Sequence, residues 1–202
     1  MNKYTVIKTK SDDFSRSDKG FIDKRVWEGD YSPLTYFKMI YEEGKGFHVY
    51  FHCDEKDPPA RMKNFGDSVC KDSCMELFAN FSPKTSDLYI NFEMNSISTL
   101  LCCVGRERHG RKSILEYSTI LPDVTSFSDG SGWGLNLFIP LSLLFSVYGE
   151  FEIKDGYTFF ANLYKCGDEM PIKHYLMFNP VKSEVPDFHR PECFAEFTVR
   201  QS

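Results

Sequence analysis

Six segments of the chain alternate apolar and polar residues with a period of two, the pattern of a β-strand with one buried face. In segment 47–53, Phe47, Val49 and Phe51 share one face, while His48 and Tyr50 share the other. The same alternation recurs in segments 72–79, 88–95, 135–139, 159–164 and 195–199. Strands that are apolar on one side pack as antiparallel sheets around a common core. We therefore predict an all-β fold, a single antiparallel β-sandwich with jelly-roll or immunoglobulin-like layers.

The rest of the chain agrees with this fold class. The 202 residues include 19 Phe and 11 Tyr, which suit pleated, half-buried surfaces better than helix faces. Turn and loop signals such as Asp57-Pro58-Pro59 separate the alternating segments, and Pro140 favours one short helix directly after it. We find no repeat and no linker long enough to divide the chain. The prediction is one domain over residues 1–202, with long loops and at most one or two short helices.

The charge balance disfavours nucleic acid as a partner. The chain carries 24 Lys and Arg against 29 Asp and Glu, a formal net charge of −5, and only segment 105–112 is strongly basic. No apolar run reaches the ~20 residues of a membrane helix, so we expect no membrane partner. The first residues lack the apolar run of a secretory signal, so we expect a cytoplasmic protein. The sequence makes no prediction about the oligomeric state.

The seven cysteines predict neither disulfides nor a structural zinc site, because no Cys-x-x-Cys pair is present. Cys70 and Cys74 are expected on one strand, ~13 Å apart and beyond the reach of a disulfide. His48 and His52 are likewise too far apart to share a metal ion. We expect reduced thiols and no cofactor.

Metal binding is otherwise undetermined by the sequence. A structural calcium ion is one possibility, because loops of the predicted fold contain oxygen donors. These donors are Asp123, Asp129 and Asp168.

The polar faces of the predicted strands are unusual, since they carry Asn, His, Tyr, Phe and Glu instead of Lys, Thr and Ser. Flat apolar rings beside amides and carboxylates are the groups that bind sugars. The alternative is a second packed layer, covered by loops 106–134 and 164–190, that only fills space. The spacing alone leaves both interpretations open.

Glu76 is the carboxylate for which the sequence offers the most possible partners. Asp72 is expected on the same strand face but ~13 Å away, too far for the paired acids of a glycoside hydrolase. Glu93 approaches Glu76 if the two strands are neighbours in the right register. The basic segment 105–112 either lies in solvent or turns an arginine back toward Glu76.

Four segments resemble the family 9 carbohydrate-binding modules and their stand-alone relatives. They are VCKDSCMELF (69–78), YINFEMN (89–95), FANLYKCGD (160–168) and PDFHRPECF (186–194), and the similarity runs from about residue 26 to the C-terminus. The resemblance implies a β-sandwich that binds the ends of glucans or xylans without cleaving them. The sugar of such a module lies between two aromatic side chains, above polar groups.

The resemblance also implies roles for individual residues. The glutamate of the family falls on Glu76, its arginine on Arg106 or Arg108, and its asparagine on Asn162. Cys70 stands where the family has a stacking tryptophan. The second aromatic platform falls on Tyr164, or more loosely on Trp133.

The leading prediction is therefore a non-catalytic carbohydrate-binding protein. The predicted ligand-binding residues are Glu76, Asn91, Arg106, Arg108, Asn162, Tyr164, Trp133 and Cys70. One alternative is a carbohydrate-active hydrolase that uses Glu76 with Glu93. Another is a protein-interaction β-sandwich that binds no sugar, and it predicts a flat exposed apolar patch in place of a concave pocket.

Overall fold

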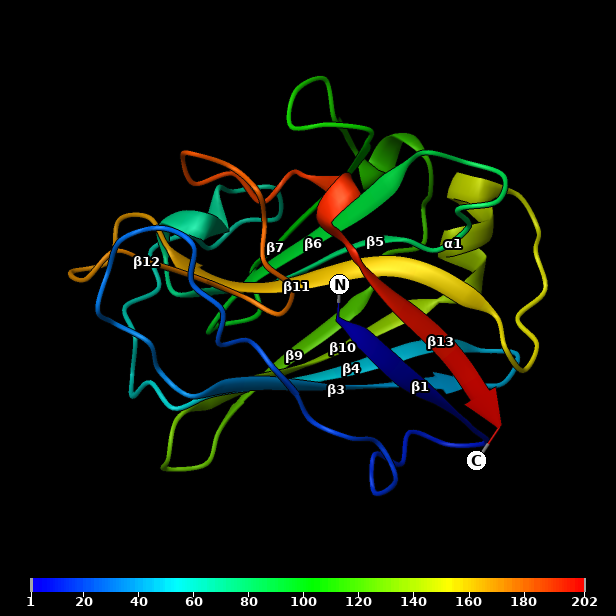
Figure 1. Cartoon of the computed structure of the whole chain (residues 1–202), viewed down its shortest axis with the longest axis horizontal. Helices are drawn as coiled ribbons and strands as arrows, with labels where there is room; N and C mark the ends of the chain where they lie inside the picture. Colours follow the sequence, from blue (N-terminus) through cyan, green and yellow to red (C-terminus); the bar gives the residue numbers. More distant parts are fainter. Residues whose placement is uncertain (1, 202) are drawn as a thin grey trace.

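A computed structural model describes residues 2–201 and shows an all-β protein with one α-helix and three short 3₁₀ turns (Figure 1). The helix α1 spans Leu141–Tyr148, and the 3₁₀ turns span Val69–Lys71, Ile114–Glu116 and Pro191–Cys193. The strands are β1 (Lys3–Thr9), β2 (Gly20–Phe21), β3 (Thr35–Glu42), β4 (Gly46–Cys53), β5 (Cys74–Asn80), β6 (Tyr89–Asn95), β7 (Leu100–Gly105), β8 (Lys112–Ser113), β9 (Asp123–Ser128), β10 (Trp133–Pro140), β11 (Thr158–Gly167), β12 (His174–Met177) and β13 (Ala195–Gln201).

The strands form one continuous sheet that curls over itself. Its order is β8-β7-β6-β5-β11-β13-β1-β3-β4-β10-β9, with β12 beside β11 and β2 beside β3. In Figure 1, β5, β6, β7 and β11 lie above β3, β4, β9 and β10, and β1 and β13 join the two halves. The all-β prediction is confirmed. The sheet is not purely antiparallel as predicted, because β1 pairs in parallel with both β13 and β3.

The main core lies between the two halves of the curled sheet. Phe47 of β4 packs against Phe159 of β11, with ring centroids 5.3 Å apart, and against Phe81, at 5.0 Å. Leu77 of β5 and Val49 of β4 are fully buried in the same cluster. The alternation in the sequence therefore predicted the inward faces correctly.

The outer face of β5, β6 and β11 is also covered, over much of its length, by a second apolar cluster. Phe78, Tyr89 and Tyr164 project outward from these strands and are almost completely buried. The segment around Phe188 and Phe194 packs over them. The space-filling interpretation is therefore right for part of this face, and the open part is the cleft described below.

The short helix predicted after Pro140 is present as α1. Leu143 and Leu144 are its buried residues, and Gly149 follows it with a φ of 76°, a left-handed conformation that suits glycine at a helix C-terminus. Among residues 2–201, no helix has both the length and the apolar character needed to cross a membrane.

The segment around Cys70 differs from the prediction. Strand β5 begins at Cys74, and Cys70 lies in a 3₁₀ turn, so the two thiols are not on one strand. Asp72 precedes β5 and does not share a strand face with Glu76. Its buried carboxylate accepts hydrogen bonds from the backbone N–H groups of Arg61 and Met62, so it is held toward the segment before β5.

Two segments predicted as long loops also contain strands. Residues 106–134 include β8 and β9, and residues 164–190 include β12. Strands β8 and β12 are short, and β9 is exposed along most of its length, so none of the three shows a clear alternation in the sequence.

Candidate functional site

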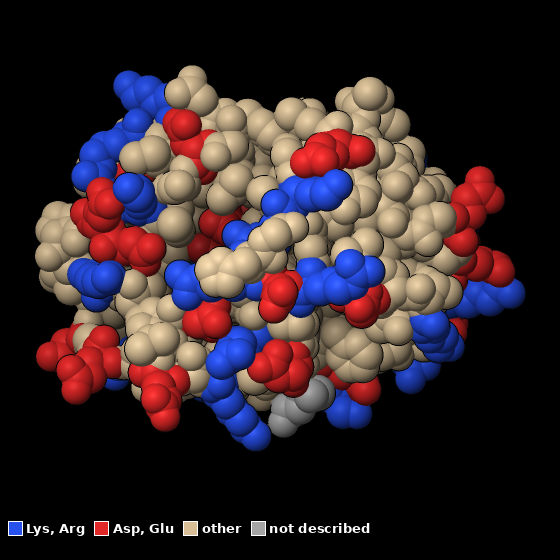
Figure 2. All heavy atoms as spheres, turned by 90° about the horizontal axis from the view of Figure 1, so that it is seen from above, with Lys and Arg blue, Asp and Glu red and all other residues tan. Residues whose placement is uncertain are grey.

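A cleft of about 290 Å³ opens on the outer face of β5, β6 and β11. Figure 2 shows this hollowed face, with acidic atoms at depth and basic atoms along the border. Sites for small molecules span about 300–1,000 Å³, so the cleft has room for one or two sugar rings. The lining residues are Ser68, Cys70, Glu76, Phe78, Glu93, Leu101, Arg108, His109, Arg111, Cys166, Asp168, Tyr175, Pro186, Asp187, Phe188 and His189.

Two carboxylates form the floor of the cleft. Glu76 of β5 and Glu93 of β6 are direct partners in the antiparallel register, and both are at least 96% buried. The Cys166 thiol donates a hydrogen bond to Glu76 Oε1 at 3.0 Å, and the Asn91 amide donates one to Glu93 Oε1 at 3.0 Å. Both acids are thus held in place from below.

The two acids disfavour each other's ionisation. Burial, and then the charge of Glu93, raises the pKa of Glu76 well above its usual value. Burial raises the pKa of Glu93 to about 7, although the charge of Arg111 acts in the opposite direction. Neither carboxylate forms a salt bridge with a described Lys, Arg or His, so their hydrogen-bonding capacity stays available to a ligand.

One rim of the cleft is basic and comes from the β7–β8 connection. Arg108 faces Asp187, with the nitrogen and oxygen 3.7 Å apart, and Arg111 lies beside His189, with Nη1 and Nδ1 3.1 Å apart. Burial, and then the charge of Arg111, lowers the pKa of His189 to about 3. Its Nδ1 is therefore an acceptor, and it also accepts a hydrogen bond from the Tyr89 hydroxyl at 2.8 Å.

Aromatic side chains supply an apolar wall of the cleft. Phe188 stacks on Tyr164 with ring centroids 4.0 Å apart and an interplanar angle of 11°. The Tyr164 hydroxyl donates a hydrogen bond to the Phe188 carbonyl at 3.0 Å, which fixes the loop. Tyr175 of β12 meets Phe188 edge to face, at 6.0 Å. The wall is thus an apolar aromatic surface held by several contacts.

The structure brings three predicted site residues to the cleft: Cys70, Glu76 and Arg108. Two other predicted residues lie beneath the lining and contact residues that line the cleft. Asn91 is fully buried and orients Glu93, and Tyr164 is fully buried and supports Phe188.

Three predicted residues do not reach the cleft. Arg106 turns away into solvent, where its Nε lies 2.8 Å from Asp87. Asn162 is buried four positions before Cys166, and its side-chain amide is used by the backbone of Asn179. Trp133 belongs to the main core on β10, outside the group that lines the cleft.

Several residues of the cleft were missed. Arg111 is in the basic segment that the sequence singled out, but two other arginines were chosen there. Asp168 and Phe188 lie inside the segments that carried the family resemblance, so the signal was present without a role attached. Tyr175 follows a weakly patterned segment, and nothing local indicated that β12 would bring it beside the cleft.

One group of side chains is suited to hold a metal ion. The ligand atoms of Cys74, Glu76 and Cys166 lie within 4.8 Å of one another. The aspartates considered for calcium are placed differently: Asp129 accepts hydrogen bonds from Ser131 in a tight turn, and Asp168 lines the cleft.

Comparisons with known proteins give the family. Residues 9–199 match the family model described as "Carbohydrate-binding family 9". None of the curated proteins compared with the chain matches it.

Solved structures share the fold. A protein from Bacteroides uniformis, provisionally named carbohydrate-binding, is 23% identical with a TM-score of 0.80, over 98% of this chain and 99% of that one. A family 9 carbohydrate-binding module from Caldicellulosiruptor kristjanssonii, in complex with cellotriose, is 9% identical with a TM-score of 0.72, over 100% and 95% of the two chains. The structure of a family 9 module from the same organism in complex with glucose is likewise 9% identical, with a TM-score of 0.72, over 100% of this chain and 97% of that one. Because the family model matches nearly the whole chain, this protein belongs to carbohydrate-binding family 9.

Proposed function

We propose that the cleft binds a carbohydrate without cleaving it, as a monosaccharide or the end of a glucan or xylan chain. The observation that carries the proposal is the pairing of Glu76 and Glu93 at the floor of a concave site with an aromatic wall and a guanidinium rim. Sugars present both C–H faces and hydroxyl groups, so they need apolar area and hydrogen-bonding groups at fixed positions together.

Each part of the cleft has a role in this proposal. Glu76 and Glu93 accept hydrogen bonds from sugar hydroxyls, and Arg108 and Arg111 donate to sugar oxygens. The faces of Tyr175 and Phe188 pack against the apolar side of the ring. The cleft is small and its floor is closed by β5, β6 and β11, which suits a chain end better than the middle of a polymer.

Cys70 gives the cleft one aromatic wall fewer than the family pattern implies. A thiol offers no flat surface, and Cys70 lies at the border of the cleft, where its carbonyl accepts the Asp168 N–H at 2.8 Å. Losing one stacking contact reduces affinity by roughly two- to tenfold, since such contacts contribute about 0.5–1.5 kcal/mol. We propose that this protein binds its sugar weakly, with the aromatic wall on the Phe188 side carrying the stacking.

The sugar specificity proposed here is supported by the two module complexes, whose ligands are cellotriose and glucose. Calorimetric titration with glucose, xylose, cellobiose and xylobiose tests it. We expect saturable heat with at least one of these at millimolar concentration, and loss of that heat in Glu76→Gln. Glu152→Gln is the matched control, since Glu152 is exposed and pairs only with Lys154. No heat with any of the four sugars contradicts the proposal.

A hydrolase remains the second candidate, because the register favours it. Directly opposed residues have Cβ atoms about 4.5–5.5 Å apart, which brings Glu76 and Glu93 into the range for paired catalytic acids. Chromatography of the same oligosaccharides after prolonged incubation separates the two functions. Intact oligosaccharides support binding alone, and shortened products that disappear in Glu93→Gln support hydrolysis. A concave site does not favour the protein-interaction alternative, which requires a flat apolar patch.

A further inference from the structure

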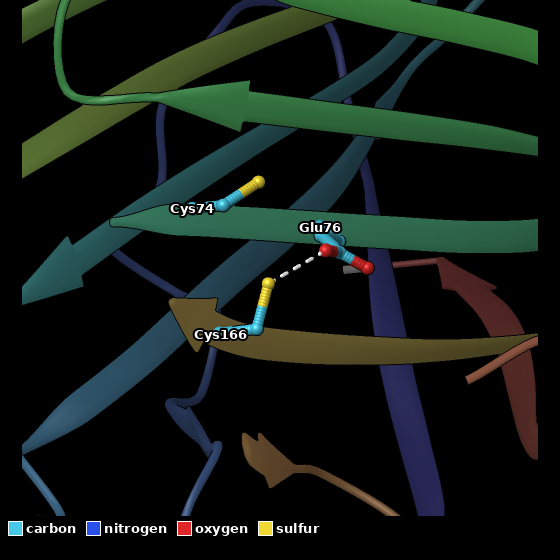
Figure 3. A group of neighbouring side chains, drawn as sticks. All are labelled: Cys74, Glu76 and Cys166. Atoms are coloured by element: carbon cyan, nitrogen blue, oxygen red, sulfur yellow. Dashed lines mark hydrogen bonds between the residues drawn. The ribbon is translucent and has the colours of Figure 1, made fainter. Parts of the chain in front are cut away.

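We propose that Cys74, Glu76 and Cys166 form a binding site for one thiophilic divalent cation, Zn²⁺ by preference, at the floor of the cleft. Their three ligand atoms lie within 4.8 Å of one another, and all three residues are buried (Figure 3). The inference rests on this geometry and does not depend on the sugar-binding proposal.

The sheet register brings the three side chains together. Cys74 and Glu76 are two residues apart on β5, so they project from the same face of the strand. Cys166 of β11 is the direct partner of Cys74. Its thiol points to Glu76, with Sγ and Oε1 3.0 Å apart, as the dashed line in Figure 3 shows. The three donors therefore occupy neighbouring positions on one rigid surface.

The donor set selects the kind of cation. Two thiolates and one carboxylate are ligands of Zn²⁺, whereas Ca²⁺ and Mg²⁺ require oxygen donors. Bonds of about 2.0–2.3 Å around a tetrahedral Zn²⁺ put the donors about 3.5–4 Å apart. The observed group needs only small side-chain rotations to reach that spacing.

The electrostatics of the group also favour a cation. No described Lys, Arg or His forms a salt bridge with Glu76, and Glu93 lies directly opposite it. A dication bound here would take the place of the thiol protons, which are released to solvent.

The geometry leaves one coordination position open. Glu76 and Cys166 both line the cleft, while Cys74 lies behind them. Three protein ligands with an open fourth position toward a cavity are typical of zinc sites that exchange water or a ligand. A metal ion here would share Glu76 with whatever occupies the cleft.

Cobalt titration of the reduced, chelator-treated full chain tests the site, because Co²⁺ bound to thiolates absorbs light and is displaced by Zn²⁺. We expect one equivalent of Co²⁺, displaced by Zn²⁺ and not by Ca²⁺. Cys74→Ser and Cys166→Ser should each weaken binding by at least about tenfold. Cys103→Ser is the matched control, because Cys103 is a partly buried thiol on β7, two strands away from β5, and this variant should bind normally.

A second readout needs no variant. In the wild-type chain, Zn²⁺ should slow the alkylation of Cys74 and Cys166 in mild urea, where transient opening exposes these buried thiols, and should leave Cys103 reactive, as mapped by peptide mass spectrometry. Equal alkylation with and without Zn²⁺, or cobalt binding unchanged in both serine variants, overturns the proposal. So does a Cys74–Cys166 disulfide that persists in the reductant. Sugar titrations in chelator are independent of this result, so failure of one proposal leaves the other testable.

Discussion

Two buried polar clusters lie on opposite faces of the sheet formed by β6, β5 and β11, and they differ in how their charges are balanced. On the inner face, Lys165 is completely buried, with its Nζ 3.5 Å from Glu55 Oε2 and 2.5 Å from His174 Nε2. Although burial alone would raise the pKa of Glu55, the charge of Lys165 and three hydrogen bonds hold it below its usual value. On the outer face, Glu76 and Glu93 form no salt bridge with a described cation, and the charge of Arg111 only partly offsets burial, so both pKa values are raised.

This difference separates a structural cluster from a candidate site. In the Glu55 cluster, Ser73, Trp133 and Tyr31 satisfy the carboxylate, so nothing is left for a ligand. At the floor of the cleft, acids of like charge are held together at a cost to stability. Such unbalanced groups are typical of functional sites, where a ligand supplies the missing partners.

The largest effect is expected from a substitution in the balanced cluster of Lys165 and Glu55. Lys165→Met leaves Glu55 buried without its counter-charge, so we expect the free energy of unfolding to fall by about 3–5 kcal/mol. Denaturant unfolding at pH 7 measures it. Lys3→Met is the control, because Lys3 is 75% exposed in its pair with Glu196 and should lose at most about 1 kcal/mol. Similar losses in both variants would contradict the assignment of a structural role to Lys165.

The unbalanced cluster should respond with the opposite sign. The pKa of Glu93 is raised in the folded chain, so its favourable contribution is complete below the unfolded pKa and is lost as the pH rises through about 7. Glu93→Gln removes this loss. We expect the variant to gain about 3 kcal/mol in the free energy of unfolding at pH 8, and to match the wild type below pH 4.5.

Urea unfolding of both chains across this pH range provides the measurement. Glu55→Gln serves as the comparison, since the pKa of Glu55 is lowered and its loss should destabilise the fold at pH 8. Destabilisation by Glu93→Gln at pH 8 would show that Glu93 is balanced like Glu55.

A smaller effect concerns the aromatic wall. Tyr175→Ala should lower sugar affinity by roughly two- to tenfold in calorimetry, because one ring face is lost. Phe21→Ala, at an aromatic residue that is 45% exposed on β2, should leave affinity unchanged. Equal effects of the two substitutions would place the stacking surface elsewhere.

The smallest effect is expected from a comparison of Arg106 and Arg108, which both lie in the β7–β8 connection. Arg106 is exposed and pairs with Asp87, so Arg106→Ala should change the free energy of unfolding by at most about 0.5 kcal/mol and leave sugar affinity unaltered. Arg108→Ala should weaken sugar binding severalfold, because Arg108 lines the cleft. The reverse order would restore Arg106 as the ligand-binding arginine.

The sequence predicted strand faces well, because a period of two is a local property of the chain. The sequence alone left open whether Glu76 and Glu93 lie opposite each other, since strand register depends on contacts that are distant in sequence. The sequence did not reveal that the Asn162 amide hydrogen-bonds the backbone of Asn179, which lies in a segment whose path is not encoded locally.

The positions of two cysteines in the strand register show the same limit. Cys74 and Cys166 are 92 positions apart in the sequence and form no local motif, yet β5 and β11 place them directly opposite each other. The segments that carried the family resemblance contain Glu76, Glu93, Cys166 and Phe188, which line the cleft. Which other side chains face the cleft depends on how loops 106–111 and 186–189 fold over the sheet.

The location of the sugar site is tested most directly by amide chemical-shift mapping during titration with glucose or cellobiose. We expect the largest shifts at Cys70, Glu76, Leu101, Tyr175 and Phe188, all around the cleft. The residues of the Lys165 cluster on the inner face should shift little. Saturable shifts confined to another surface, with none at these five residues, would contradict the account.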